Sequence, residues 1–231
     1  MAVNDIASNL RSLRAKIDFH ARRCGRNPQR IELLAVSKTF SAQVIDQVVG
    51  AGQRLLGENR IQEAEEKIPQ VQGGGLTWHL IGHLQSNKAR KAVEIFDVIQ
   101  TLDSEKILLK VGRWAEQLGK ELRVYLQVNI GEEAQKHGIS PDQVQSLVRR
   151  VDCAPSLELV GLMAIPPYQE DAEAVRPYFR RMRALLEEVN QRRERPLAGL
   201  SMGMSHDYPI AIEEGATLLR IGQAIFGERR R

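Results

Sequence analysis

Eight short apolar segments, separated by stretches with helical hydrophobic periodicity, limit the folds that are open to this chain. Such alternation predicts a parallel sheet with helical crossovers, and eight repeats predict an α/β fold closed into a (β/α)8 barrel of the TIM type. An open, doubly wound sheet is the alternative architecture. The predicted strands are Glu32–Val36, Arg54–Gly57, Thr77–Ile81, Asp97–Thr101, Arg123–Asn129, Leu157–Met163, Gly199–Met202 and Thr217–Ile221.

A further helix is predicted ahead of the first strand, because an apolar stripe recurs there at helical spacing. The stripe consists of Ile6, Leu10, Leu13 and Ile17. A length of 231 residues suits one barrel domain. We therefore expect a single domain over residues 1–231, with an extra N-terminal helix and connection in 1–30 and the barrel in 31–228.

The composition argues against a membrane span, because no segment approaches 18 consecutive apolar residues. The amino-terminal segment mixes charged and apolar residues and lacks the uninterrupted apolar core of a secretory signal. Cys24 and Cys153 lie far apart and belong to no CxxC pair, which predicts unpaired thiols in a reducing compartment. A cytoplasmic protein without a membrane partner is expected.

The net charge of +4 comes largely from two groups of arginines, one within residues 22–30 and one at Arg229–Arg231. Proteins that bind nucleic acid usually combine a basic face with aromatic residues that stack on bases. Aromatic residues make up 5% of this chain, and none interleaves with these arginines. We therefore expect a solvated basic surface and no nucleic-acid partner, with RNA or another macromolecule as the alternative partner.

In a barrel of this kind, functional residues lie at the carboxyl ends of the strands. Lys38 follows the first predicted strand and is therefore placed at the mouth of a low-dielectric barrel. Desolvation there disfavours the ammonium form and favours the free amine, a nucleophile that can form a Schiff base with an aldehyde. Taken alone, a lysine after a strand is more often a solvated surface residue.

Two glycine-containing segments lie at the ends of the seventh and eighth predicted strands. Residues 201–205 lead into a predicted helix, His206–Glu214, and residues 220–227 close the barrel. These loops often hold phosphate, because their backbone N–H groups point at the anion and glycine permits close approach; Ser205 adds a hydroxyl. Each segment taken singly is more simply a tight turn. Together with Lys38 they suit a phosphorylated aldehyde, for which pyridoxal 5′-phosphate (PLP) is the obvious candidate.

Six segments of the sequence resemble, in order, motifs of the pyridoxal phosphate homeostasis protein family, and the resemblance covers essentially the whole chain. It implies a barrel similar to the amino-terminal domain of alanine racemase, with PLP held as a Schiff base on Lys38. It also implies a role in vitamin B6 and amino-acid homeostasis. The segments are AVSKTF (35–40), GENRIQE (57–63), WHLIGHLQSNK (78–88), GLMAIPP (161–167), SMGMSHDY (201–208) and RIGQAIFG (220–227).

The resemblance implies further cofactor-binding residues. The phosphate would be held by Ser205 and Gly222 and by the backbone around Met204 and Gln223. Arg220 would face the pyridine nitrogen, and Asn59 and Met163 would line the site. Family members commonly carry threonine where this chain has Gln223, so a hydroxyl contact is lost there and a backbone N–H is the expected donor.

A binding and delivery role is expected rather than fast catalysis. Arg220 can only donate, so it would keep the pyridine nitrogen unprotonated and weaken the electron sink that catalysis needs. The second domain that supplies an acid or base in alanine racemases is not expected here. The predicted protein is a non-catalytic, monomeric carrier with apo PLP-dependent enzymes as recipients. A slow amino-acid racemase or transaminase with Lys38 as base is the alternative.

The histidines are weaker candidates for a functional site. His79 and His83 are four residues apart, but they lie on a strand and its exit, so a place at the barrel mouth is favoured over a metal site. His20, His137 and His206 show no partner spacing. They are interpreted as surface or capping residues, and no metal is expected.

Lys136 lies in the loop after the fifth predicted strand, at the same end of the barrel as Lys38. It is a candidate second site that captures or passes on the aldehyde. A solvated loop lysine is the simpler interpretation, and the sequence leaves both open.

Overall fold

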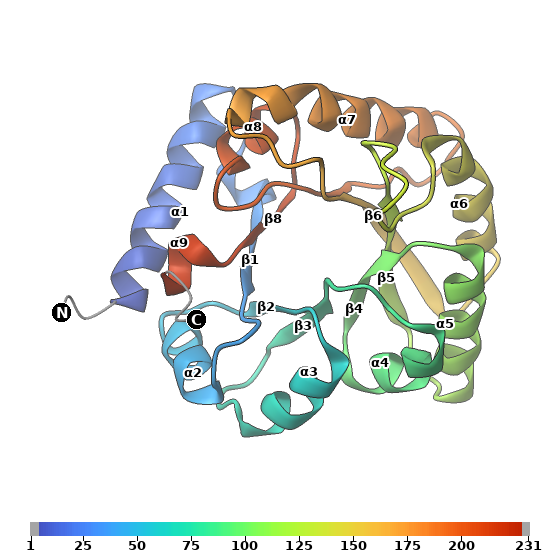
Figure 1. The fold of residues 1–231 in the computed structure, drawn as a ribbon, viewed down its shortest axis with the longest axis horizontal. Coiled ribbons are helices and arrows are strands. Elements are labelled where there is room, and N and C mark those ends of the chain that lie inside the picture. The colour runs from blue at the N-terminus through green and yellow to red at the C-terminus, as the bar shows by residue number, and fades with distance from the viewer. Residues whose placement is uncertain (1–4, 228–231) are drawn as a thin grey trace.

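The computed structural model describes residues 5–227, and its eight parallel strands form a closed barrel (Figure 1). The strands are β1 Glu32–Val36, β2 Leu55–Glu58, β3 Thr77–Leu80, β4 Val98–Leu102, β5 Leu122–Val128, β6 Leu157–Ala164, β7 Gly199–Ser201 and β8 Leu218–Ile221. Strand β1 pairs with β2 on one side and with β8 on the other, so the sheet closes on itself. This arrangement confirms the predicted (β/α)8 barrel and excludes the open doubly wound sheet.

Helices surround the barrel on its outer side (Figure 1). They are α1 Ile6–Arg23, α2 Ala42–Gly50, α3 Ile61–Lys67, α4 Ala89–Ile95, α5 Glu105–Gln117, α6 Val144–Asp152, α7 Arg176–Asn190, α8 Tyr208–Glu213 and α9 Gln223–Phe226. The predicted extra helix is α1, which buries its apolar stripe beside α8 and α9. The Asp5 side chain accepts a hydrogen bond from the Ser8 backbone N–H at 3.1 Å and caps this helix.

The apolar core has two parts. The larger cluster fills the layer between the outer faces of the strands and the apolar faces of the helices. A smaller buried cluster contains Leu34, Val98, Tyr125, Met163 and Leu218, all of them strand residues. Because these side chains pack together, the barrel is filled rather than open as a pore, and its functional space lies at the ends of the strands.

Most strand boundaries differ from the prediction by one residue, and two boundaries have a local explanation in the structure. Strand β2 ends one residue later than predicted, at Glu58, because the Ile81 backbone N–H donates to the Glu58 carbonyl oxygen at 2.9 Å and continues the pairing with β3. Lys67 and Ser37 donate to the Glu58 carboxylate at 2.8 and 2.7 Å. Helix α8 begins two residues later than predicted. The cause is a turn in which the Asp207 side chain accepts from the Met204 backbone N–H at 2.6 Å.

Three surface features bear on the expected compartment and partners. None of the helices within residues 5–227 combines the length and apolar character needed to span a bilayer. Cys24 and Cys153 are free and exposed, which confirms that these thiols are unpaired. The arginines at 229–231 lie outside the described residues, so the interpretation of this basic segment stays a prediction.

Candidate functional site

A cavity of about 430 Å³ opens at the carboxyl ends of the strands. Small-molecule sites typically have volumes of roughly 300–1,000 Å³, so a cofactor-sized ligand fits this space. The predicted site residues that line it are Lys38, Asn59, Met204, Ser205, Arg220, Gly222 and Gln223. The structure places Met163 elsewhere, in the buried cluster of strand residues. Seven of the eight predicted positions therefore meet at one cavity.

Lys38 lies just beyond the end of β1, in a turn that neighbouring residues hold in place. Thr39 has a φ of 71°, in the left-handed region. Such a conformation costs a non-glycine residue about 1–3 kcal/mol and persists when surrounding contacts enforce it. The Thr39 backbone N–H donates to Glu63 Oε1 at 2.5 Å, so α3 supplies this contact. The position of Lys38 thus depends on the adjoining β2–α3 unit.

A network of buried charges supports the same turn. Lys67 Nζ lies 2.8 Å from Glu58 Oε1 and 2.6 Å from Glu63 Oε1. It also donates to the Ser37 carbonyl oxygen at 3.2 Å, next to Lys38 in the chain. Burial raises the pKa of the Glu58 carboxyl, although Lys67 and Ser37 donate hydrogen bonds to it. Removing one partner would leave an uncompensated buried charge, so these residues are coupled in stability.

Arg220, on β8, lines the cavity although its side chain is buried. Its Nη1 donates to Ser201 Oγ at 2.7 Å, and its Nη2 donates to the Ala164 carbonyl oxygen at 2.8 Å. Burial lowers the pKa of the guanidinium to about 10, an effect that the nearby Asp207 opposes. The group is therefore protonated at neutral pH and presents fixed N–H donors.

A chain of hydrogen bonds runs from Arg220 through the barrel interior to His79. Ser201 Oγ donates to Gln100 Oε1 at 2.6 Å, and Gln100 Nε2 lies 2.8 Å from His79 Nδ1. Because an amide nitrogen can only donate, His79 accepts at Nδ1. Burial lowers the pKa of His79 to about 3, so the ring is neutral. The prediction that His79 lies at the barrel mouth is wrong, since the ring is buried among strand residues.

The loops after β7 and β8 meet at the rim of the cavity. Gly203 has a φ of 93°, and a Cβ atom there would lie 2.6 Å from the Ala211 Cβ, so the turn requires glycine. Ser205 Oγ accepts from the Ala224 backbone N–H at 3.3 Å and links the two loops. Gly222, at the turn into α9, lines the cavity beside them. The two loops thus bring a serine hydroxyl, backbone N–H groups and glycines to one place. Phosphate sites in proteins are commonly built from such groups.

The donor set fits PLP. Lys38 carries the amine that a Schiff base with an aldehyde needs, Arg220 carries N–H donors suited to a ring nitrogen, and Ser205 carries a hydroxyl suited to a phosphate. Asn59 adds an independent observation, because its Oδ1 atom is buried and has no hydrogen-bond partner among the described residues. Buried polar atoms are rarely left unsatisfied, and a ligand hydroxyl would supply the missing donor.

Two residues belong to this cavity that sequence reasoning assigned differently. Lys136, the candidate for a second site, lines the same cavity as Lys38; its Nζ pairs with Glu133 at 2.5 Å and donates to the Pro166 carbonyl oxygen at 3.2 Å. His206, interpreted as a surface or capping residue, also lines the cavity. The position after a strand, at the functional end of the barrel, indicated Lys136 in the sequence, and the same signal could have found His206 after β7.

Comparisons with known proteins identify relatives of similar length. Residues 8–230 match the family described as alanine racemase, N-terminal domain. The pyridoxal phosphate homeostasis protein of Escherichia coli is 43% identical over 231 residues, covering 98% of each chain. The protein of the same name from Aquifex aeolicus is 39% identical over 215 residues, covering 93% of this chain and 94% of the relative.

Solved structures share the architecture. PipY of Synechococcus elongatus with PLP bound is 37% identical, with a TM-score of 0.83, and the match covers 96% of this chain and all of PipY. Alanine racemase of Bartonella henselae with covalently bound pyridoxal phosphate is 15% identical, with a TM-score of 0.70. That match covers 98% of this chain and 61% of the racemase, and it shows likeness of fold alone.

Proposed function

The chain belongs to the pyridoxal phosphate homeostasis protein family, and from this premise we propose that it binds PLP and stores, buffers or delivers it. It thereby maintains vitamin B6 and amino-acid homeostasis. The observation that carries the proposal is the presence of Lys38 and the buried Arg220 in one cavity. The likeness to PLP-bound PipY supports the same cofactor.

Each group in the cavity has a proposed part in holding the cofactor. Lys38 holds PLP as a Schiff base through its amine, and the β2–α3 contacts orient that lysine. Arg220 donates to the pyridine nitrogen, and Asn59 accepts from a ring substituent. The phosphate is held by Ser205, by Gly222 and by the backbone around Met204 and Gln223. When bound, PLP supplies a reactive aldehyde and an electron-withdrawing ring.

A carrier without turnover of its own is the form of the proposal that the Arg220 environment favours. A protonated donor opposite the ring nitrogen leaves that nitrogen without a proton, and the ring then stabilises carbanions less well. The Ser201–Gln100–His79 chain behind Arg220 contains no acid that could supply a proton. The alternative is a slow racemase or transaminase that uses Lys38 as its base. An assay of amino-acid turnover distinguishes this enzyme from a carrier.

Delivery of PLP to another protein requires that this protein can reach the opening of the cavity. Tyr168 and Met204 at the cavity rim are 78% and 36% exposed, so apolar surface is available there. We propose apo PLP-dependent enzymes as recipients and a monomeric, cytoplasmic carrier, in which exposed thiols stay reduced. The chain would act as one domain over 1–231, with the barrel in 31–228 and the N-terminal helix and connection in 1–30.

Transfer to an apo-enzyme tests the function. The chain is loaded with PLP, freed of unbound cofactor and mixed with an apo PLP-dependent enzyme, whose recovered activity is measured. We expect the PLP-loaded protein to restore the activity of the apo-enzyme, and Lys38→Ala, loaded and washed in the same way, to restore none. The carrier itself should turn over no amino acid. Lys136→Ala is the matched lysine control in the same cavity. Turnover that depends on Lys38 would favour the racemase or transaminase alternative, and failure to retain PLP would contradict both.

A further inference from the structure

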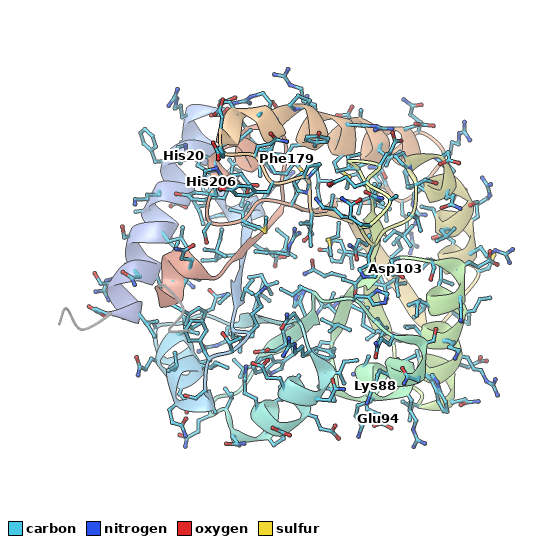
Figure 2. The ribbon with its side chains drawn as sticks, in the orientation of Figure 1. His20, Lys88, Glu94, Asp103, Phe179 and His206 are labelled. Carbon is cyan, nitrogen blue, oxygen red and sulfur yellow. The ribbon has the colours of Figure 1, made fainter. Side chains whose placement is uncertain are left out.

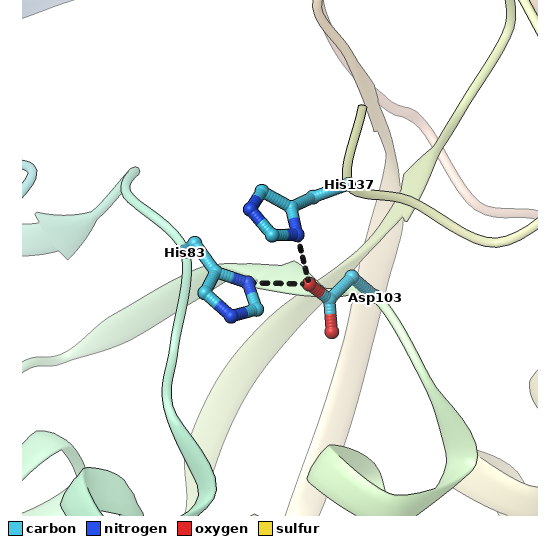
Figure 3. A group of neighbouring side chains, drawn as sticks. All are labelled: His83, Asp103 and His137. Atoms are coloured by element: carbon cyan, nitrogen blue, oxygen red, sulfur yellow. Dashed lines mark hydrogen bonds and ion pairs between the residues drawn. The ribbon is translucent and has the colours of Figure 1, made fainter. Parts of the chain in front are cut away.

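Three metal-ligating side chains meet at the rim of the barrel outside the PLP cavity. His83 follows β3, Asp103 follows β4, and His137 lies in the loop after β5 (Figure 3). Figure 2 shows Asp103 on the side of the barrel mouth away from His206, which lines the cavity. None of the three lines that cavity. The proposed function therefore gives this group no role.

Their ligand atoms converge. His83 Nδ1 lies 2.7 Å from Asp103 Oδ2, and His137 Nδ1 lies 3.8 Å from the same oxygen. One ligand atom from each residue lies within 4.8 Å of the other two. The Asp103 side chain is 6% exposed, whereas the side chains of His83 and His137 are 38% and 57% exposed. The carboxylate is thus buried, whereas the two imidazole side chains are exposed enough to change rotamer.

We propose that His83, Asp103 and His137 bind a divalent transition-metal ion of the zinc class. Two imidazole nitrogens and one carboxylate oxygen are preferred ligands of such ions, and three protein ligands leave a position for water. Zinc bonds of about 2.0–2.1 Å in a tetrahedral site separate the ligand atoms by roughly 3.3 Å. That spacing lies between the 2.7 and 3.8 Å found here, so small side-chain rotations complete the site.

The two imidazole rings must also turn. They are stacked, with centroids 3.7 Å apart and planes 10° apart. The nitrogen lone pair lies in the ring plane, so one ion between two parallel rings cannot lie along both lone pairs. The exposed His137 side chain has room to rotate, while Ser104 Oγ donates to Asp103 Oδ1 at 3.3 Å and steadies the carboxylate. Metal binding would therefore separate the stacked rings of His83 and His137, while the Asp103 carboxylate keeps its position.

The site would act on the cavity through the loop after β5. His137 directly follows Lys136, which lines the cavity. Asn129 and Glu133 exchange two hydrogen bonds within this loop, at 2.9 and 3.3 Å, and the Lys136 backbone N–H donates to the Glu133 carbonyl oxygen at 3.0 Å. These contacts link the start of the loop to the Lys136–His137 pair. A metal joining His137 to Asp103 ties the loop to the neighbouring strand ends. This consequence rests on the proposed function, whereas the metal site itself does not.

Titration of the full-length protein with Co²⁺, followed by its visible absorption, and displacement by Zn²⁺ test the site. We expect one equivalent of bound Co²⁺ that Zn²⁺ displaces. His83→Gln and His137→Gln should each weaken the affinity by about tenfold or more, since each removes a ligand. His20→Gln, the same change away from the rim, should leave the affinity unchanged. Equal binding by the wild type and both rim variants, or no saturable binding, would overturn the proposal.

Two controls separate this site from other metal ligands. Cys24 and Cys153 are exposed, and thiolates are a second class of ligand for Co²⁺. Because the proposed site contains no thiol, a Cys24→Ser/Cys153→Ser variant should retain the signal. Loss of the signal in that variant would assign the metal to the thiols and overturn the proposal. The rim variants should keep the wild-type circular dichroism and PLP retention, which shows that their folding and PLP cavity are intact and that metal affinity alone has changed.

Hydrogen exchange tests the effect on the loop. Zn²⁺ should slow amide exchange in residues 129–139 of the wild type, because the ion would fasten His137 to Asp103. The same addition should have no such effect in His83→Gln. Unchanged exchange in the Zn²⁺-bound wild type would overturn the coupling between the metal and the cavity mouth.

Discussion

Arg220 Nη1 donates a hydrogen bond to Ser201 Oγ, and the two atoms are 2.7 Å apart. Because a guanidinium has donors only, Ser201 must accept this hydrogen bond, and its own hydroxyl hydrogen is left to donate to the next residue. Ser201 donates onward to Gln100, and Gln100 donates to a neutral His79. This series of hydrogen bonds therefore holds the Arg220 side chain in place and contains no carboxylate. Arg220 remains a cationic donor at the cavity.

Ser201→Ala should weaken PLP binding by about tenfold, since a hydrogen bond to a charged group contributes about 1.5–3 kcal/mol and the guanidinium would lose its anchor. The proposed Schiff base on Lys38 should still form, because Ser201→Ala leaves that lysine in place. Equilibrium PLP affinity from absorption titration measures the effect. Ser146→Ala on the exposed face of α6 is the matched control, and equal affinities of the two variants would contradict the positioning role of Ser201.

His79 should make the protein sensitive to acid. Its pKa is about 3 in the folded state, so protons bind the unfolded chain first as pH falls below 6.5. Its contribution to stability is therefore complete above that pH and is lost as pH falls toward 3. Between about pH 6 and 4, the unfolding free energy of the wild type should fall more steeply than that of His79→Leu, by about 1.4 kcal/mol per pH unit.

Urea unfolding at several pH values measures that slope. The slope is the test rather than the stability at one pH, because His79→Leu also deprives Gln100 of its acceptor. Parallel stability curves for wild type and His79→Leu would show that this ring does not resist protonation.

Lys67→Met should lower the unfolding free energy by about 3–5 kcal/mol, because it leaves the buried Glu58 carboxylate without its cation. Adding Glu58→Gln to this variant should recover much of the loss, since the uncompensated charge is then removed. Chemical denaturation of the single and double variants measures both effects. Additive losses in the double variant would show that the two residues are not coupled.

Gly203→Ala should weaken phosphate recognition. The residue has a φ of 93°, and its new Cβ would press on the Ala211 Cβ, so the loop that carries Ser205 must shift. The ratio of PLP affinity to pyridoxal affinity should fall by about tenfold, on the order of one lost charge-assisted hydrogen bond. Gly119→Ala is the matched control, because Gly119 also has a positive φ but open space around its Cα. An unchanged ratio in Gly203→Ala would contradict the phosphate assignment.

The sequence predicted the elements of this fold well because its signals are local. The apolar alternation located every strand to within about one residue. Polar residues and glycines after strands 1 and 7 indicated Lys38 and the loop at Ser205, whereas Arg220, inside strand 8, was implied by the family resemblance.

Side-chain direction and pairing between distant segments could not be predicted in this way. Met163 was expected at the site, but its side chain packs in the buried cluster with Leu34, Val98, Tyr125 and Leu218 and does not line the cavity. The pairing of the buried Glu58 with Lys67 joins the end of β2 to the end of α3, and no pattern in the sequence indicated it. His83 and Asp103 likewise meet because adjacent strand ends converge, which no spacing in the sequence encodes.

Borohydride trapping tests the central claim most directly. The visible absorption of PLP-treated protein is recorded before and after reduction, and the modified peptide is identified by mass for the wild type, Lys38→Ala and Lys136→Ala. The account predicts a reducible band and a label on the peptide containing Lys38, both absent in Lys38→Ala and present in Lys136→Ala. A label on Lys136, or no reducible band in the wild type, would contradict it.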